Sequence, residues 1–137
     1  MQKINIKIVN TAGIIATHSA ELVVVPGAMG DIGINFSERS VPYLLKAGVI
    51  YIFNNNSVEH KYGVIDGRFY YEGDTLVIIS NFDIYKIDNK SLENLNNDIK
   101  NCEQILAKTS VEELKNYYNQ KLNNYNLLLN SVNNLAY

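Results

Sequence analysis

The chain of 137 residues has little of what several common classes of site require. It has one cysteine, Cys102, so an internal disulfide is excluded. Its two histidines, His18 and His60, are far apart in the sequence and do not suggest a structural zinc site. The 12 basic and 14 acidic residues give a formal net charge of -2, which leaves no positive surplus to neutralise a phosphate backbone. Neither a metal ion nor nucleic acid is therefore expected as a partner.

Long hydrophobic runs are also absent. The longest, residues 22–25 and 76–79, are far shorter than the roughly 18 apolar residues of a membrane-spanning helix. The opening stretch MQKINIKIVN alternates apolar and polar residues, whereas a secretory leader has a continuous apolar core. We expect no direct membrane insertion and no secretion. Hydrophobic residues make up 47% of the chain, so one modest core is expected, in one domain or one domain with an appendage.

Motifs of catalysis and nucleotide binding are missing too. The sequence has no GxxxxGK[ST] loop, nucleophile elbow, HExxH or CxxC. Gly27, Gly30 and Gly33 lie between two expected strands rather than between a strand and a helix, which indicates a wide turn that needs positive φ. Cys102 lies on the apolar face of an expected helix, where a thiol is usually an inert packing residue. No catalytic residue and no cofactor is expected.

The residues before Asp88 have the pattern of short strands. Ile4, Ile6 and Ile8 alternate with polar neighbours, as in a half-buried strand. Further strands are expected at residues 14–18, 20–25, 31–35, 44–53, 58–65, 68–72 and 75–80. Turn residues punctuate them regularly, which is typical of a β-sandwich or barrel. Residues 43–45 carry too little period to decide between a strand and a short helical turn.

Asp66-Gly67 is the strongest hairpin signal, because a type I′ turn needs positive φ at both central residues and these two types tolerate it. Asn54 to Ser57 and Gly73-Asp74 are further turn signals. The asparagine run at 54–56 otherwise fits a general bias of the composition toward Asn, Ile, Lys and Tyr.

From Asn89 onward the apolar spacing changes to threes and fours, which predicts amphipathic helices. The apolar face of the first consists of Leu92, Leu95, Ile99, Cys102 and Ile105 or Leu106. Ser110 and Glu113 have capping-box spacing and start a second helix. Its apolar stripe consists of Val111, Leu114, Tyr118, Leu122, Tyr125, Leu129 and Val132. The predicted fold class is α+β, with an N-terminal antiparallel β-sandwich over residues 1–87 and a C-terminal antiparallel two-helix hairpin over residues 88–137.

Asparagine is abundant in residues 88–137. Each one costs about 0.5 kcal/mol relative to alanine inside a helix, so neither helix should persist alone in water. The helices must therefore depend on packing against each other, the sandwich or a partner. We expect a conditional, movable hairpin.

Two segments carry a family resemblance. Residues 26–34, PGAMGDIGI, and residues 44–49, LLKAGV, resemble the signature of the epsilon subunit of bacterial F-type ATP synthase, which reads PGxxGE(I/L)GI and then LKPGxV at the same spacing. That family, homologous to the mitochondrial delta subunit, continues with a Gly-Gly turn and a VTVLA-like strand, matched here by Asp66-Gly67 and residues 75–79. It ends with two helices, so the resemblance covers essentially the whole chain.

The chain departs from the family pattern at two places. Residues 37–40 read Ser-Glu-Arg-Ser where members have Gly-His-Ala-Pro. Nucleotide-binding members open the first C-terminal helix with Ile-Asp-x-x-Arg-Ala and use further arginines, whereas the matching positions are Ile87, Asp88, Ser91 and Leu92, and residues 88–137 contain no arginine. Regulatory ATP binding is not expected, because the phosphates would lack bidentate donors.

The resemblance implies a non-catalytic rotor subunit in the central stalk of a proton-translocating ATP synthase, peripheral on the cytoplasmic face of the bacterial plasma membrane. The sandwich would dock on the gamma subunit and the c-subunit ring. It implies a rotor interface made of Gly30, Asp31, Gly33 and Glu38. The hairpin would extend to the catalytic head subunits and inhibit ATP hydrolysis. Its regulatory stripe would be Val111, Leu114, Tyr118, Leu122 and Tyr125.

Two other hypotheses remain. The heptad-like stripe over residues 111–132 is also compatible with a free-standing β-sandwich binding module that dimerises through its C-terminal helices. An enzyme ranks third, because no catalytic constellation is evident. Catalytic turnover that is lost when a carboxylate such as Glu72 is replaced would support the enzyme hypothesis.

Overall fold

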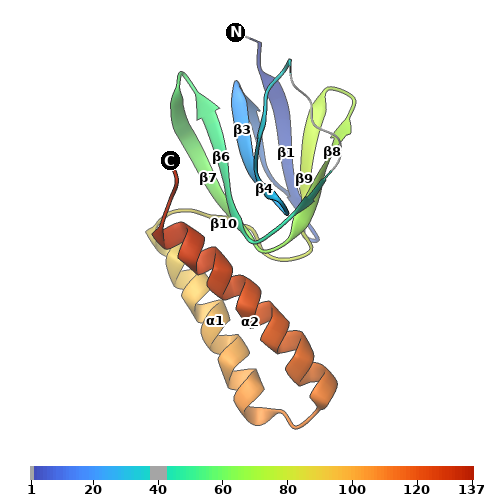
Figure 1. The fold of residues 1–137 in the computed structure, drawn as a ribbon, viewed down its shortest axis with the longest axis vertical. Coiled ribbons are helices and arrows are strands. Elements are labelled where there is room, and N and C mark those ends of the chain that lie inside the picture. The colour runs from blue at the N-terminus through green and yellow to red at the C-terminus, as the bar shows by residue number, and fades with distance from the viewer. Residues whose placement is uncertain (1, 38–42) are drawn as a thin grey trace.

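The computed structural model describes residues 2–37 and 43–137. Within this part of the chain, strands are followed by two helices (Figure 1). The strands are β1 (Ile4–Asn10), β2 (Gly13–Ala20), β3 (Leu22–Gly27), β4 (Gly30–Ile34), β5 (Tyr43–Leu45), β6 (Gly48–Asn54), β7 (Ser57–Val64), β8 (Gly67–Glu72), β9 (Thr75–Ile79) and β10 (Tyr85–Lys86). The helices are α1 (Asn89–Lys108) and α2 (Glu112–Asn133). The predicted fold class, a β-sandwich followed by a helical hairpin, is confirmed.

The strands form one hydrogen-bonded sheet that folds over on itself. Its order is β10-β7-β6-β3-β5-β8-β9-β1-β2, with β4 paired to β3. The pairings are antiparallel except that of β1 with β9, which is parallel. A single residue pair, Gly27 with Leu45, joins β3 to β5, and the sheet passes there from one layer to the other.

Isoleucine, valine and leucine fill the space between the two layers. The period-two pattern of β1 places Ile4, Ile6 and Ile8 inside, each at most 1% exposed. We call this set the inner core. It consists of Ile4, Ile6, Ile8, Ala20, Val23, Val25, Ile34, Leu45, Ile50, Ile52, Tyr62, Val64, Phe69, Leu76 and Ile78.

The hairpin predicted at Asp66-Gly67 is wrong. β7 and β8 do not pair with each other; β7 pairs with β6 and β10, and β8 with β5 and β9, so this segment crosses between the layers. Gly67 is still required, because a Cβ there would lie 2.2 Å from the Ile79 carbonyl oxygen. β6 and β10 occupy the two edges of β7, so β8 pairs with β5 and β9 instead.

Positive φ at both turn residues occurs instead at Asn55 and Asn56, with φ of 55° and 61°, between β6 and β7. The preceding Asn54 is 4% exposed. Its side-chain amide donates to the Ser19 carbonyl oxygen at 2.9 Å, and its Oδ1 accepts from the Glu21 amide at 3.1 Å. The asparagine run is thus a structural turn rather than only a compositional bias.

One further expectation is wrong, one open alternative is decided, and one strand was not predicted. The strand expected over residues 44–53 is two strands, β5 and β6, because the chain turns at Lys46 and Ala47. Residues 43–45 form a strand paired with β8 rather than a helical turn. The short strand β10 was not predicted, because two residues carry no period.

The hairpin helices lie against one outer face of the sandwich at one end, while their connecting loop lies farthest from it (Figure 1). The buried side chains of this contact form what we call the junction cluster. It consists of Val24, Ala47, Val49, Tyr51, Ile65, Tyr85, Leu95, Ile99, Cys102, Tyr125, Leu128 and Val132. Neither helix in the described part of the chain is long and apolar enough to cross a membrane.

The predicted capping box is wrong. The N-cap of α2 is Val111, and no side chain caps it. The Val111 amide instead donates to Thr109 Oγ1 at 3.2 Å. The hydroxyl that satisfies an amide at this end of the helix therefore comes from the connecting loop, one residue before Ser110.

Candidate functional site

The glycine motif of residues 26–34 forms the β3–β4 hairpin. Gly30 has φ of 134°, a conformation that favours glycine, as the motif predicted. A Cβ at Gly27 would lie 2.6 Å from Ile32 Cδ1 and 2.7 Å from the Gly30 carbonyl oxygen. The turn is narrower than expected, because residues 28–29 alone lie between the two strands.

The second motif segment, residues 44–49, packs against the first. The Lys46 amide donates to the Pro26 carbonyl oxygen at 2.9 Å, and the Ala28 amide donates to the Leu44 carbonyl oxygen at 3.2 Å. Gly48 permits this approach, since a Cβ there would lie 2.7 Å from Pro26 Cβ. The two segments that carry the family resemblance are therefore adjacent in the structure.

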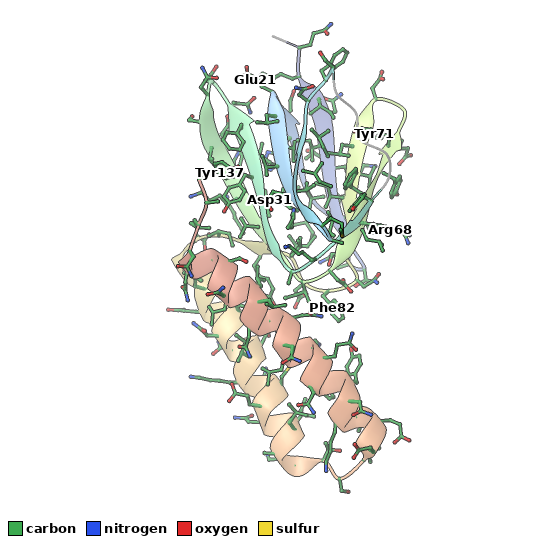
Figure 2. All side chains as sticks on the ribbon, in the orientation of Figure 1. Glu21, Asp31, Arg68, Tyr71, Phe82 and Tyr137 are labelled. Atoms are coloured by element: carbon green, nitrogen blue, oxygen red, sulfur yellow. The ribbon has the colours of Figure 1, made fainter. Side chains whose placement is uncertain are left out.

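The predicted rotor-interface residues lie on this hairpin, apart from one. Asp31 and Gly33 are exposed and Gly30 is half-buried, and Figure 2 shows Asp31 on the face of the sandwich. Met29, at the tip, is 89% exposed. Glu38 lies outside the described residues, as do the other family-loop positions 39–42. The turn thus presents a carboxylate and a large apolar side chain on an exposed loop, which suits contact with another protein.

Asp31 also lines a cavity of about 210 Å³ between the sandwich and the C-terminal end of α2. Lys46 and Tyr51 line it from the sandwich, and Ser131 and Asn134 line it from the helical side. The β3–β4 turn and the end of the hairpin therefore meet at one place.

The comparisons with known proteins agree with this arrangement. The family model described as ATP synthase, Delta/Epsilon chain, beta-sandwich domain matches residues 3–82, more than half of the chain. The chain belongs to this ATP synthase family. As a delta/epsilon chain it is a non-catalytic subunit of the central stalk.

One curated relative and two solved structures match this chain beyond the sandwich. The ATP synthase epsilon chain of Campylobacter fetus subsp. fetus (strain 82-40) is 26% identical over 110 residues, which cover 80% of this chain and 84% of the relative. A chain in the Euglena gracilis mitochondrial ATP synthase (OSCP/F1/c-ring, rotational state 1) has a TM-score of 0.68 at 10% identity, covering 96% of this chain and 82% of that one. A chain in the central stalk and c-ring of Tetrahymena thermophila mitochondrial ATP synthase has a TM-score of 0.56 at 11% identity, covering 96% and 97%.

A polar network lies inside the junction cluster of this delta/epsilon chain. The Tyr85 hydroxyl donates to Asp98 Oδ2 at 2.5 Å, joining β10 to α1. Burial, the Asp98 hydrogen bond and the neighbouring Tyr125 raise the pKa of Tyr85 far above its usual value. The hydroxyl therefore stays protonated and keeps donating. Sequence reasoning missed this network, because its members come from three elements and share no spacing.

Lys121 on α2 points into a group of aromatic rings. Its Nζ lies 5.4 Å from the ring centroid of Phe82, and 5.8 to 6.0 Å from those of Tyr117, Tyr118 and Tyr125. These distances are within the range of cation–π attraction. Phe82 precedes β10 and lies at the base of the sandwich in Figure 2, so the contact ties the middle of α2 to the sandwich.

The predicted regulatory stripe changes its surroundings along α2. Val111 and Leu114 are 48% and 43% exposed. Tyr118 and Leu122 are half-buried, and Tyr125 is 4% exposed. Tyr118 and Leu122 pack against the edge of the junction cluster and Tyr125 is buried within it, so the stripe becomes more buried toward its C-terminal end.

Leu128, which the stripe omitted, is fully buried at 0% exposure. It packs over Gly63 of β7, where an added Cβ would lie 3.0 Å from Leu128 Cδ1. The run of leucines at 127–129 carries no period of its own, so the spacing alone chose Leu129 instead. Gly63, which leaves room for a side chain of α2 to pack on β7, is the feature that could have identified Leu128.

The two histidines, which are far apart in the sequence, are in contact across the seam between β2 and β7. Their ring centroids are 4.2 Å apart, and His18 Nε2 lies 2.7 Å from the Tyr62 hydroxyl. Burial, followed by the nearby His60, lowers the pKa of His18. Among residues 2–37 and 43–137, no group of three or more His, Cys, Asp or Glu side chains is arranged to hold a metal ion.

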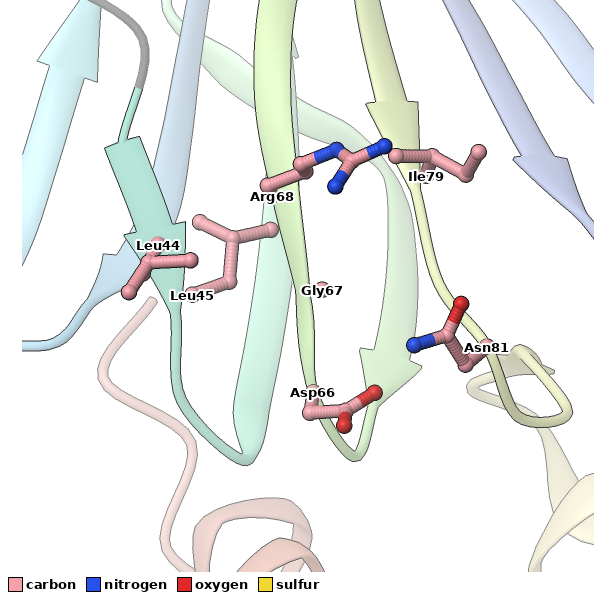
Figure 3. A pocket seen from close by; sticks show the side chains of 7 residues that line it. All are labelled: Leu44, Leu45, Asp66, Gly67, Arg68, Ile79 and Asn81. Carbon is pink, nitrogen blue, oxygen red and sulfur yellow. The ribbon is translucent and has the colours of Figure 1, made fainter.

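A small pocket opens between β5 and the β8–β9 pair (Figure 3). Asp66 contributes a carboxylate and Arg68 a guanidinium, and Asn81 lies opposite. Burial raises the pKa of Asp66, while a backbone hydrogen bond with Asn81 partly opposes the shift. One carboxylate with no second acid or nucleophile in the lining offers no acid–base pair.

Proposed function

We propose that this chain docks through residues 1–87 on the gamma subunit and the c-subunit ring, and carries rotation between the ring and the catalytic head of a proton-translocating ATP synthase. The observation that carries the proposal is the close packing of residues 26–34 against residues 44–49, which fixes Asp31 on an exposed turn. The two structural neighbours belong to assemblies that contain a c-ring, which supports the same surroundings for this chain. It would lie peripherally on the cytoplasmic face of the bacterial plasma membrane.

The test is recovery of partners. Affinity capture of the full chain from membranes of its own cells should retain gamma and c subunits. Asp31→Lys should reduce their recovery, because it reverses the charge on the turn. Glu72→Lys, at the exposed end of strand β8, is the matched control and should not reduce it. If Asp31→Lys still recovers both partners, the β3–β4 turn is not part of the interface. If the unaltered chain recovers neither the gamma nor the c subunit, the proposal is wrong.

A second part of the proposal concerns residues 88–137. In the docked form α2 covers β6 and β7; in an extended form the hairpin would reach the head and inhibit ATP hydrolysis. The support is the partial burial of the stripe, whose distal residues Val111 and Leu114 remain exposed while the hairpin is docked. Removing residues 88–137 should raise ATP hydrolysis by the assembled complex. An unchanged rate in complexes that still contain the shortened chain would contradict inhibition.

The chain is proposed to work without bound nucleotide. Residues 88–137 contain no arginine, and Lys121 is engaged with aromatic rings rather than open to a phosphate. Calorimetric titration of the full chain with MgATP should show no binding at millimolar concentration. The dimerisation hypothesis is less favoured, because Tyr125, Leu128 and Val132 already pack within the chain.

A further inference from the structure

The residues after α2 do not continue the helix axis but turn back onto the sandwich. Asn134 ends the helix, with its backbone amide donating to the Asn130 carbonyl oxygen at 3.1 Å and its side-chain amide donating to the same oxygen at 2.9 Å. In Figure 1 the tail then runs from the end of α2 to the sandwich, where it contacts side chains of β6. The hydrogen bonds of Asn134 therefore fix the direction in which residues 135–137 leave the helix.

The tail makes specific contacts with β6. The Ala136 amide donates to the Tyr51 hydroxyl at 3.1 Å. The Tyr137 ring meets Tyr51 edge-on, with centroids 4.9 Å apart and planes at 78°. It meets Phe53 in the same way, at 5.4 Å and 82°. Edge-to-face pairs at these separations are attractive beyond simple burial.

The two sides of this contact differ in burial. Tyr51 is 4% exposed and belongs to the junction cluster beneath α2, whereas Tyr137 is 54% exposed and lies on the surface in Figure 2. The exposed tail therefore contacts Tyr51, a buried residue that also packs beneath α2. Its own loss of solvent is modest, so it can detach without exposing a large apolar surface.

We propose that residues 134–137 are a strap that holds the end of α2 on β6 and so sets the balance between docked and extended hairpin. The proposal rests on the extended form described under the proposed function. The strap must leave Tyr51 before α2 can leave the sandwich. Lys121 and Phe82 hold α2 nearer its middle, so the strap governs the C-terminal end.

The native cysteine provides the reporter. Cys102 is the sole cysteine of the sequence, is 3% exposed in the junction cluster, and burial raises the pKa of its thiol. Its labelling by a thiol reagent is therefore slow while the hairpin is docked and follows the population of the open form. Hydrogen exchange of the α2 amides at residues 125–133 gives a second readout that does not depend on the thiol.

The experiment compares full-length variants. Tyr137→Ala removes both ring contacts and should speed Cys102 labelling and α2 exchange about tenfold. Tyr137→Phe keeps the ring and is the matched control, with rates within about twofold of the unaltered chain. Exchange in β1, within the inner core, should be unchanged in both variants and shows that the sandwich stays folded.

Each outcome decides the proposal. Unchanged rates in Tyr137→Ala would overturn the strap, as would an equal acceleration in Tyr137→Phe or accelerated exchange throughout β1. ATP hydrolysis by the assembled complex separates the strap from the proposed inhibition. Faster labelling with unchanged hydrolysis supports the strap and counts against inhibition. Unchanged labelling, with hydrolysis still raised by removal of residues 88–137, overturns the strap and leaves inhibition standing.

Discussion

The inner core and the junction cluster are both mainly aliphatic, but they differ in the polar groups that they contain. The inner core is almost entirely aliphatic, and Tyr62 is the one member that carries a hydroxyl. The junction cluster holds the hydroxyls of Tyr51, Tyr85 and Tyr125 and the thiol of Cys102. Exposing a fully buried aliphatic side chain costs about 1.5 to 3 kcal/mol, whereas water can replace a hydrogen bond at a net cost of about 0.5 to 1.5 kcal/mol. The inner core is therefore suited to a permanent contact, and the junction cluster to a contact that can separate.

The largest expected effect comes from breaking the inner core. Phe69 is fully buried between the layers, and Phe69→Ala should lower the free energy of unfolding by about 3 to 5 kcal/mol because it leaves a cavity. Urea denaturation followed by circular dichroism measures this. Leu114→Ala, at an exposed helical position, should change it by less than about 0.5 kcal/mol. Equal losses in the two variants would mean that the sandwich is not the permanent part.

The next effect separates the two regions. Gly63→Val places a branched side chain where Leu128 now packs, and should release α2 because an added Cβ is already 3.0 Å from Leu128 Cδ1. Hydrogen exchange of residues 125–133 should rise about tenfold, which is the effect of a loss of about 1.4 kcal/mol in docking. Exchange in β1 should stay unchanged. Gly33→Ala is the control, since its Cβ would make only an ordinary contact of 3.6 Å with Leu22.

A smaller effect tests the polar network. Asp98→Ala leaves the buried Tyr85 hydroxyl without the acceptor it now has at 2.5 Å, at a cost to docking of about 1 kcal/mol, because Asp98 is only half-buried and water can reach the vacated position. Tyr85→Phe removes the hydroxyl itself. The double variant should therefore lose less than the sum of the two single variants, as judged by α2 exchange. Strict additivity would show that the two groups do not interact.

The same contrast explains what could be predicted from the sequence. The alternation of Ile4, Ile6 and Ile8 and the spacing of Leu95, Ile99 and Cys102 report burial directly, so the sandwich and the helices were predictable. The resemblance also located the glycine motif. The backbone hydrogen bonds between this motif and residues 44–49 were not predicted, because hydrogen bonds between distant segments leave no local sequence pattern.

The errors fall where tertiary contacts override local preference. Asp66-Gly67 has ideal hairpin chemistry, yet it crosses between layers because β8 pairs with β5 and β9. Ser110 has capping chemistry, yet Thr109 satisfies the Val111 amide. At the candidate site, the Tyr85 and Asp98 contact and the Tyr137 tail depend on where the hairpin lies. The position of the hairpin is set by the packing of the junction cluster, which combines residues from several strands and both helices, so no single sequence segment predicts it.

The smallest effect concerns a titratable contact beside the inner core, that of His18 with Tyr62. His18 faces His60 and Tyr62, with Glu59 and Lys86 nearby. Burial lowers the pKa of His18 below 6.5 in the folded chain. The stability this provides is therefore present above pH 6.5 and is lost as the pH falls through the folded pKa, because the unfolded chain binds the proton first.

The urea midpoint should accordingly drop between pH 7.5 and pH 5 by an amount equivalent to no more than about 0.5 kcal/mol, since solvent screens the partly exposed ring. His18→Gln keeps a polar partner for Tyr62 but does not titrate, so the difference between its midpoint and that of the unaltered chain should shrink at low pH. A difference that is constant across this range would mean that the seam between β2 and β7 is indifferent to the charge on His18. The inner core would then be independent of pH at this edge, and the polar contacts whose loss frees the hairpin would lie in the junction cluster.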